Sequence, residues 1–138
     1  MSFVHYTTNR LVKGEDLNHH GTLYAGRTAE WFVESGFVAA SKLTRPENIV
    51  CLQIHEMVFK RPVNKGDVVS LESAIVLAGR TSLVAFVRME VQNEQVFNGF
   101  ITFIHVDLDG KPIPHGIKIS AETSDELALQ EAARQLKK

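Results

Sequence analysis

Residues 18–42 read NHHGTLYAGRTAEWFVESGFVAASK, and this stretch decides the fold. Apolar residues recur in it at helical spacing and form one broad apolar face. This face is made by Ala29, Phe32, Val33, Gly36, Phe37 and Ala40. We expect Thr22 to cap the helix and the helix to stop before Pro46, because the residue before a proline avoids helical backbone. A helix this apolar must be covered over most of its circumference. Its small residues let it lie close against the neighbouring surface.

The residues on either side of this helix predict strands and turns. Residues 3–13 indicate a first strand, and residues 14–21 form a loop rich in Gly, Asp and Asn. Beyond the helix, four stretches suit pleated strands, namely residues 49–59, 68–77, 82–92 and 95–106. In the second of these stretches the odd-numbered residues share one face, from Val69 to Leu77.

The end of the chain predicts a short amphipathic helix over residues 124–138. Asp125 and Glu126 at its start and Lys137 and Lys138 at its end complement the helix dipole. The elements together predict an α+β fold, in which a curved antiparallel sheet covers the long helix. An α+β sandwich with the helix on one face is the competing arrangement, and periodicity alone leaves both open.

Length and composition describe one soluble globular domain over residues 1–138, with 44% apolar and 22% charged residues. The formal net charge of −1 gives no general attraction to nucleic acid or to a membrane surface. The first residues lack the apolar core of a signal peptide, and no stretch is long enough to span a membrane. We therefore expect a cytoplasmic protein, with its single cysteine, Cys51, as a buried structural thiol.

Three motifs resemble those of the hotdog acyl-CoA thioesterases, and of the bacterial acyl-CoA hydrolases in particular. Residues 16–26, DLNHHGTLYAG, are similar to the family's Asp-x-Asn-x-x-Gly-x-hydrophobic-aromatic-Gly-Gly turn before its central helix. Residues 57–69, MVFKRPVNKGDVV, resemble its strand ending in Phe-x-(Lys/Arg)-Pro, followed by a Gly-Asp turn. Residues 79–82, GRTS, look like its Gly-Arg-Ser-Ser hairpin.

The resemblance implies the hotdog fold, a long central helix wrapped by a curved antiparallel sheet, with the short C-terminal helix added. It implies hydrolysis of an acyl-CoA at a site between two protomers that pair their sheets edge to edge. It also implies a homodimer or a larger assembly, a tetramer or hexamer. No metal or organic cofactor is implied, because coenzyme A is part of the substrate.

Thioester hydrolysis needs hydrogen-bond donors for the carbonyl oxygen and a group that positions or activates water. Free N–H groups at the start of the helix can serve as donors, and Gly26, with Ala25 before it, stands at the family's glycine positions. Alternatively, Gly26 only permits close contact between helix and sheet. Asn18 matches the asparagine that positions water or substrate in the family, although asparagine is also common in turns.

The acid is where the sequence departs from the family's pattern. Val33 stands at the position of the family's catalytic aspartate, and valine cannot act as a base or a nucleophile. We expect Glu34 to take this role, with Glu30 in reserve. A shift of one residue rotates a side chain by about 100° around the helix. The alternative is that both glutamates form a salt-bridged stripe with Arg27.

Two basic segments are expected to bind the phosphates of coenzyme A. Lys60 and Arg61 lie beside a proline corner, and Arg80 is followed by Thr81 and Ser82 in a predicted hairpin. Arginine suits a phosphate because its planar fork donates two parallel hydrogen bonds. A solvated turn is the alternative for both segments.

Histidine chemistry and two further functions remain open. His19 and His20 flank the turn and could hold or relay a proton there, although surface roles are expected for both. His55 is expected to face the core or to line the pocket. Val33 favours a second reading, a protein that binds acyl-CoA without cleaving it. A hydratase or dehydratase that pairs His20 with Glu34 is a third reading.

Overall fold

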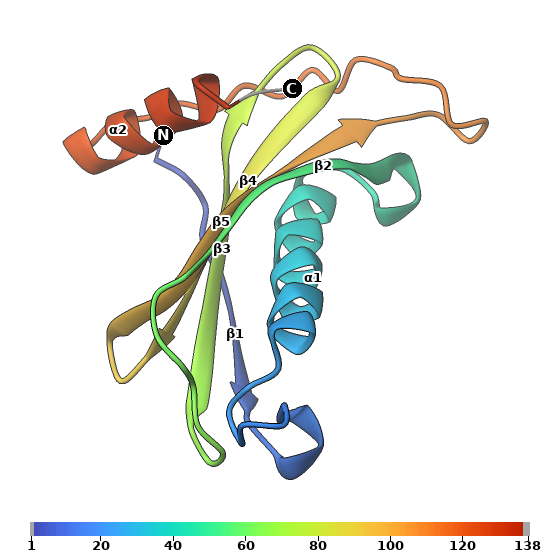
Figure 1. The fold of residues 1–138 in the computed structure, drawn as a ribbon. Coiled ribbons are helices and arrows are strands. Elements are labelled where there is room, and N and C mark those ends of the chain that lie inside the picture. Colours follow the sequence, from blue (N-terminus) through green and yellow to red (C-terminus); the bar gives the residue numbers. More distant parts are fainter. Residues whose placement is uncertain (1, 137–138) are drawn as a thin grey trace.

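The computed structural model describes residues 2–136 and shows a long helix, α1 (Ala25–Leu43), packed on one face of a five-stranded antiparallel sheet (Figure 1). The strands are β1 (Tyr6–Leu11), β2 (Ile49–Phe59), β3 (Val68–Ala78), β4 (Ser82–Val91) and β5 (Glu94–His105), in the spatial order β1-β3-β4-β5-β2. Two short 3-10 turns, η1 (Gly14–Asp16) and η2 (Pro46–Asn48), flank α1. A second helix, α2 (Ser124–Arg134), lies across the opposite face of the sheet, beside the N-terminus. The predicted α+β architecture is confirmed.

The sheet carries one apolar cluster on each face. On the α1 face, Phe32 and Ala39 of the helix are completely buried against Leu71, Ile101 and Phe103 of the strands. On the α2 face, a smaller cluster gathers residues of the same strands with the N-terminal segment and α2. Its buried members are Phe3, Ala74, Val76, Val84, Phe100 and Ala133. Alternation along β3, β4 and β5 therefore supplies both clusters.

Two glycines let α1 lie close to the sheet. A methyl group on Gly36 would come within 2.9 Å of the Ile101 side chain. One on Gly99 would meet the Glu56 carbonyl oxygen and lie 2.7 Å from the Phe32 ring. Gly99 pairs with β2 beside a register shift between Ile54 and Glu56. The Phe32 ring thus packs on strand backbone that carries no side chain. This is the close approach of helix and sheet that the small residues predict.

The start of α1 differs from the expected one. The helix begins at Ala25 with Tyr24 as its N-cap, and no side chain caps it. Thr22 instead exchanges hydrogen bonds with the Asn18 side chain and bridges to Asn64. The prediction of Thr22 as the cap is therefore wrong, because the loop engages its hydroxyl two residues before the helix begins.

A bulge in β3 corrects a second expectation. The pairing of β3 with β4 shifts register between Ile75 and Leu77. Because one extra residue moves the following side chains to the other face, Leu77 packs with the α2 cluster while Ala78 packs with the α1 cluster. Val69, Leu71, Ser73 and Ile75 keep the predicted common face, and all four are buried.

β2 is an edge strand with exposed apolar side chains on both of its faces. Leu52 is 60% exposed, Phe59 50% and Ile54 42%. Cys51, on the same strand, is also exposed, so the prediction of a buried thiol is wrong for the single chain. Its partial burial still raises the pKa of the Cys51 thiol.

The predicted C-terminal helix forms over Ser124–Arg134, and Lys137 and Lys138 lie outside the described residues. Thr123 caps it by accepting a hydrogen bond from the Glu126 N–H, and Glu126 returns one to the Thr123 N–H. Within residues 2–136, neither helix has the length and apolar character to cross a membrane.

Gly99→Ala tests the close packing of α1 on the sheet. The added methyl group meets backbone of β2 and the Phe32 ring, so we expect a loss of about 1–3 kcal/mol in the free energy of unfolding. Gly14→Ala is the matched control, because no described residue other than its chain neighbours lies within 4 Å of a methyl group there. Denaturant unfolding of both variants measures the difference. Equal stability of the two variants would contradict close packing of α1 at Gly99.

Glu126→Gln tests the junction of the N-terminus with α2. Hydrogen bonds from the N–H groups of Glu122, Phe3 and Thr123 hold the pKa of Glu126 below its ordinary value of 4.5. We expect the variant to be less stable at neutral pH, because a neutral amide is a weaker acceptor. A lowered pKa gives stability that is present above the ordinary pKa and lost as the pH falls through the folded-state pKa. Thermal melts should therefore show the difference shrinking below about pH 4.5; a constant difference would argue against it.

Candidate active site

The first turn of α1 presents two backbone N–H groups that have no acceptor. Among the described residues nothing accepts a hydrogen bond from the N–H of Ala25 or Gly26, whereas those of Arg27 and Thr28 bind the Tyr24 carbonyl. The N-terminus of a helix carries partial positive charge, and its free N–H groups point outward along the axis. The arrangement can therefore bind an oxygen that carries or develops negative charge.

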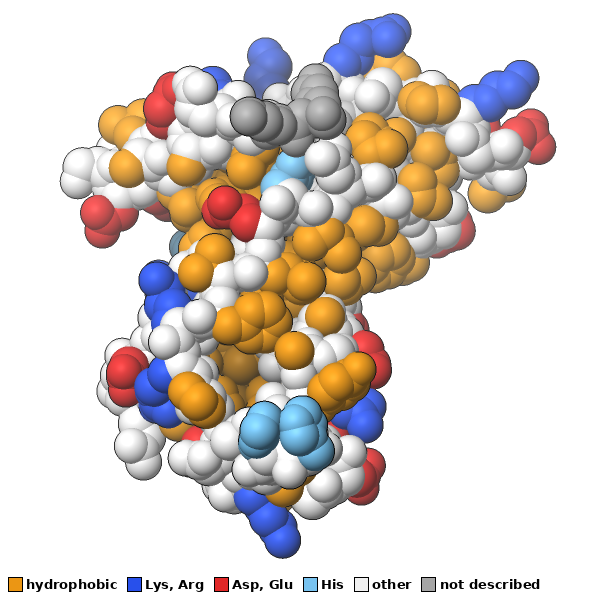
Figure 2. All heavy atoms as spheres, in the orientation of Figure 1, with side chains coloured by type: hydrophobic (Ala, Val, Ile, Leu, Met, Phe, Trp, Pro, Cys, Tyr) orange, Lys and Arg blue, Asp and Glu red, His pale blue; other side chains and the backbone are white. Residues whose placement is uncertain are grey.

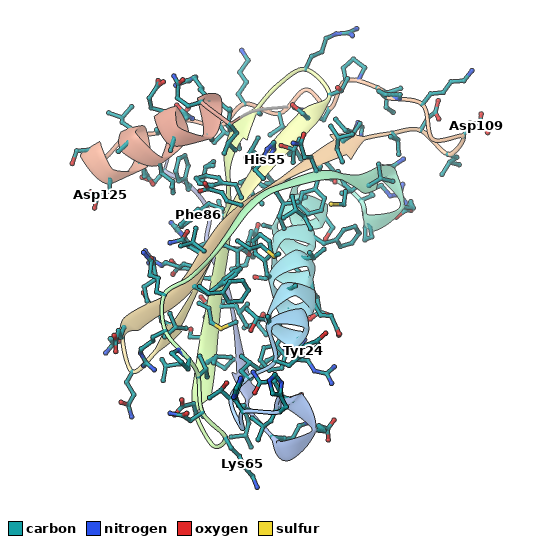
Figure 3. All side chains as sticks on the ribbon, in the orientation of Figure 1. Tyr24, His55, Lys65, Phe86, Asp109 and Asp125 are labelled. Atoms are coloured by element: carbon teal, nitrogen blue, oxygen red, sulfur yellow. The ribbon has the colours of Figure 1, made fainter. Side chains whose placement is uncertain are left out.

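Tyr24 covers this turn from the side. Figure 3 places it at the start of α1, and its side chain is 55% exposed. A side chain at position 26 would lie 2.8 Å from the Tyr24 Cζ atom. The three atoms nearest to such a side chain all belong to Tyr24, so the bare Gly26 makes room for the tyrosine ring. Its role as a donor remains a prediction.

Asn18 closes the loop before the helix. Its Oδ1 accepts hydrogen bonds from the N–H groups of His20, at 2.8 Å, and Thr22, at 3.2 Å. Its Nδ2 donates to the Thr22 hydroxyl at 3.1 Å. The side chain therefore has the structural role expected of a turn asparagine. One of its two amide hydrogens suffices for the Thr22 contact, which leaves the other for a further acceptor.

A hollow of about 350 Å³ opens beneath the first turn of α1. Asn18 and Thr22 lie at its rim, and Ala25 and Thr28 line it from the helix. Figure 2 shows a hollow lined with hydrophobic side chains above a pair of histidine rings. The remaining lining residues come from the strands and the segment after β2: Leu23, Phe59, Lys60, Arg61, Pro62, Val63, Met89, Val96 and Phe97.

An open groove of about 530 Å³ runs along the outer side of the same helix. It begins at Gly26 and reaches Phe37, and Cys51 and Phe103 line it from the sheet. Its other lining residues are Ala29, Glu30, Val33 and Glu34. Ala25 borders the hollow and Gly26 borders the groove, so the two residues with free N–H groups line different spaces.

The two candidate carboxylates have different surroundings. Glu34 forms an ion pair with Arg10 of β1, and the Arg10 guanidinium stacks over Trp31 at 5.3 Å. Glu30 is 67% exposed and its carboxylate lies 3.4 Å from Arg27. At 1.5 Å per residue, Glu34 is about 12 Å along the helix axis from Gly26, and Glu30 only about 6 Å. The prediction that Glu34 is the base stays untested, and its ion pair draws it toward β1.

Asp16 is a buried carboxylate whose role the sequence did not assign. It is 4% exposed, accepts a hydrogen bond from the Lys13 N–H, and lies 3.1 Å from the Arg27 Nε. The Asp16 carbonyl also accepts the Tyr24 N–H. This residue therefore ties the loop to the first turn of α1. The signal in the sequence that could have indicated this role was its position as the first residue of the motif in residues 16–26.

The two segments expected to bind phosphates lie far apart in one chain. Lys60 donates its N–H to the Val96 carbonyl, while Thr81 accepts the N–H of His105. Val96 and His105 are nine residues apart on β5, a distance of about 30 Å in a strand. Arg61 is engaged by Glu94 at 3.0 Å. One protomer therefore does not join Lys60 and Arg61 to the hairpin of Arg80, Thr81 and Ser82, and their binding of phosphate stays a prediction.

The histidines do not form one catalytic group with the first turn of α1. The ring centroids of His19 and His20 lie 4.0 Å apart in the exposed loop, with the two rings tilted by 42°. His55 lies toward the opposite end of the sheet from Tyr24, and its Nε2 is 2.6 Å from the Thr102 hydroxyl (Figure 3). Among residues 2–136 there is no group of three or more His, Cys, Asp or Glu side chains placed to hold a metal ion.

The comparison with known families shows the family of the chain. Residues 20–97 match the family described as the thioesterase superfamily. The chain belongs to the thioesterase superfamily. The matched residues include the first turn of α1, the whole of β2 and the floor of the hollow.

Individual relatives of this thioesterase are named as acyl-CoA hydrolases. It is 29% identical to the uncharacterized acyl-CoA thioester hydrolase YkhA of Bacillus subtilis (strain 168) over 126 residues, which cover 87% of this chain and 72% of that protein. It superposes with a TM-score of 0.84 on an apo-hexameric acyl-CoA thioesterase, at 29% identity over 94% of this chain and 86% of the other. An acyl-CoA hydrolase of Staphylococcus aureus, in complex with butyryl coenzyme A, coenzyme A and coenzyme A disulfide, gives a TM-score of 0.86 at 23% identity, covering 95% and 82%. The family, the hotdog fold and the hydrolase class expected from the motifs are confirmed.

Proposed function

We propose that this thioesterase hydrolyses an acyl-CoA to the free acid and coenzyme A at the first turn of α1. The observation that carries the proposal is the pair of unpaired N–H groups on Ala25, which lines the hollow, and Gly26, which lines the groove. Attack of water on a thioester places negative charge on the carbonyl oxygen, and fixed donors stabilise that charge more than they stabilise the ground state. The proposed chemistry uses only the chain's own groups and water.

A second copy of the chain completes the proposed site. The outer edge of β2 has no neighbouring strand among residues 2–136 and presents exposed apolar side chains on both faces. Such an edge favours pairing with another strand. Pairing β2 with β2 of a second copy would cover the groove at Cys51 and Phe37. A hexameric acyl-CoA thioesterase is 29% identical to this chain, which supports a homodimer that assembles further.

We propose that Glu30 activates the attacking water. Residues four apart share a helix face, and side chains on a helix tilt toward its N-terminus, so the Glu30 carboxylate is directed back toward Gly26. Glu30 borders the groove, and its contact with Arg27 at 3.4 Å is long and exposed. Glu34, first in the sequence-based expectation, is one turn farther away and is held by Arg10.

Matched glutamine variants separate the two carboxylates. We expect Glu30→Gln to lower kcat by about 100-fold or more, because general-base catalysis contributes roughly this much. Glu34→Gln should leave kcat within a few-fold, because only an exposed ion pair is lost. Release of free thiol from an acyl-CoA, followed in both variants at matched folding, measures the effect. The opposite pattern would assign the base to Glu34.

The proposed role of Asn18 is to orient the water or the thioester with its second amide hydrogen. Asn18→Asp keeps the Oδ1 acceptor of the turn but removes the amide donor and adds a negative charge. We therefore expect the melting temperature to change little and the turnover to fall about 100-fold. Asn18→Ala, the companion variant, should lose both stability and turnover. Unchanged turnover in the aspartate variant would leave Asn18 only its structural role.

Binding of acyl-CoA without hydrolysis is the second candidate function, and Val33 favours it. Alanine variants of an asparagine and an aspartate fifteen positions apart have been solved for the Staphylococcus aureus hydrolase, and Asn18 and Val33 have the same separation here. The valine makes that wall of the groove apolar. Recovery of intact acyl-CoA after long incubation with saturating wild-type protein would establish this function in place of hydrolysis.

A further inference from the structure

We infer that the Tyr24 hydroxyl is a third hydrogen-bond donor to the thioester oxygen, beside the N–H groups of Ala25 and Gly26. The inference rests on the proposed hydrolysis. It adds to that hydrolysis a polar group at a position where the family's motif asks only for an aromatic residue. Because the hydroxyl would touch the oxygen on which negative charge develops, Tyr24 would be a catalytic residue.

The backbone of Tyr24 is held from both sides. Its N–H donates to the Asp16 carbonyl at 2.9 Å, and its carbonyl accepts the N–H groups of Arg27 at 2.9 Å and Thr28 at 3.1 Å. Asp16 is itself buried and paired with Arg27. The origin of the Tyr24 side chain is therefore fixed at the N-terminal end of α1 (Figure 3). A donor that is already in place needs little reorganisation when charge develops.

The edge of the Tyr24 ring that carries the hydroxyl lies over Gly26. A methyl group on Gly26 would overlap the Tyr24 Cε2 atom and would lie 2.8 Å from Cζ and 3.0 Å from the hydroxyl oxygen. Side chains on a helix tilt toward its N-terminus, so the position of this methyl group is on the side to which the free N–H groups point. The hydroxyl therefore lies at the same end of the turn as the two backbone donors.

The hydroxyl and the Gly26 N–H are close enough to share one acceptor. The Cβ position of a residue is about 2.5 Å from its own nitrogen, so the Tyr24 hydroxyl oxygen lies within about 5.5 Å of the Gly26 nitrogen. Two donors that each bind an oxygen at about 2.9 Å can share it when they are up to about 5.8 Å apart. One thioester oxygen can therefore accept hydrogen bonds from both groups.

The Tyr24 hydroxyl is available for this contact. Among residues 2–136 no group forms a hydrogen bond with it, and its side chain is more than half exposed. A phenol donates one hydrogen bond through its O–H, and tyrosine is one of the side chains that stabilise an oxyanion in this way. The chain's other tyrosine, Tyr6 at the start of β1, packs instead against the α1-face cluster.

The hydroxyl keeps its proton through the proposed reaction. Water adds to the thioester carbon and gives a proton to Glu30, while the π electrons of the carbonyl move onto its oxygen. Tyr24 and the two N–H groups hold this oxygen by hydrogen bonds. When the electron pair returns, the carbon–sulfur bond breaks and coenzyme A leaves as a thiolate, which takes the proton from Glu30. The products are the free acid and the thiol.

Tyr24→Phe in the full-length protein removes the hydroxyl and keeps the ring. We expect kcat for an acyl-CoA to fall about 100-fold, the usual effect of removing one donor to an oxyanion, with KM within a few-fold of the wild type. The melting temperature should stay the same, because the hydroxyl has no partner among residues 2–136 to lose. Tyr6→Phe is the matched control and should leave kcat unchanged.

Gly26→Ala is an independent test, because its methyl group displaces the Tyr24 ring while the hydroxyl and both N–H groups stay present. Alanine favours a helix over glycine by up to about 1 kcal/mol, so the variant should fold. We expect kcat to fall by about as much as in Tyr24→Phe. In the double variant the two losses should not multiply, since each substitution removes the same hydrogen bond.

The outcomes separate the inference from the hydrolysis on which it rests. Wild-type protein that releases no free thiol from butyryl-CoA, decanoyl-CoA or palmitoyl-CoA contradicts both. Hydrolysis by the wild type with an equal kcat in Tyr24→Phe, or with only KM changed, overturns the inference and leaves the hydrolysis in place. A loss in Gly26→Ala that is just as large in the phenylalanine background would come from the methyl group itself, and would also overturn the inference.

Discussion

The contact of Phe32 with Gly99 is the constraint on which the rest of the structure depends. α1 connects the two edge strands, β1 and β2, and therefore has to cross the sheet. It can approach closely only where the sheet offers bare backbone, and Gly99 provides it beneath the Phe32 ring. One turn before Phe32 the helix carries only Thr28 and Ala25 toward the sheet. The hollow is the space between these small side chains and the buried floor. The small side chains at positions 25 and 28 thus set the depth of the hollow.

The first turn of α1 keeps its N–H groups free because every residue that could cap it is engaged elsewhere. Tyr24, which precedes the helix, has no side-chain acceptor directed at the turn. Asn18 and Thr22 are good capping residues, yet they bind each other within the loop. Buried Asp16 is paired with Arg27 and the Lys13 N–H. An uncapped turn costs about 1 kcal/mol of helix stability. The loop does not offset this loss of stability, and two oriented donors stay available to a ligand.

The elements could be predicted from the sequence because each has a local cause. The strands follow from β-branched residues between glycine turns, and α1 from apolar spacing over nineteen residues. The errors have non-local causes. Leu77 changes face because of a bulge in the pairing with β4, and Thr22 fails as a cap because Asn18 engages it. Cys51 is exposed because its apolar neighbours form an edge that has no partner strand within the described residues. The motifs located the first turn of the site, but the hollow depends on side chains from three parts of the chain and has no local signature.

The position of the carboxylate determines what a second copy must contribute. A base at position 33 or 34 lies at least about 10 Å along the helix from the Gly26 donor, farther than any side chain reaches, so it could act only on substrate bound to another protomer. A base at Glu30 lies within one turn of the donors of its own chain. On that arrangement the donors and the base belong to one protomer. The partner then has to exclude water from the groove, where donors in a dry site act more strongly. Val33 is consistent with this division, because an apolar residue in the groove favours a covered interface over an exposed charge.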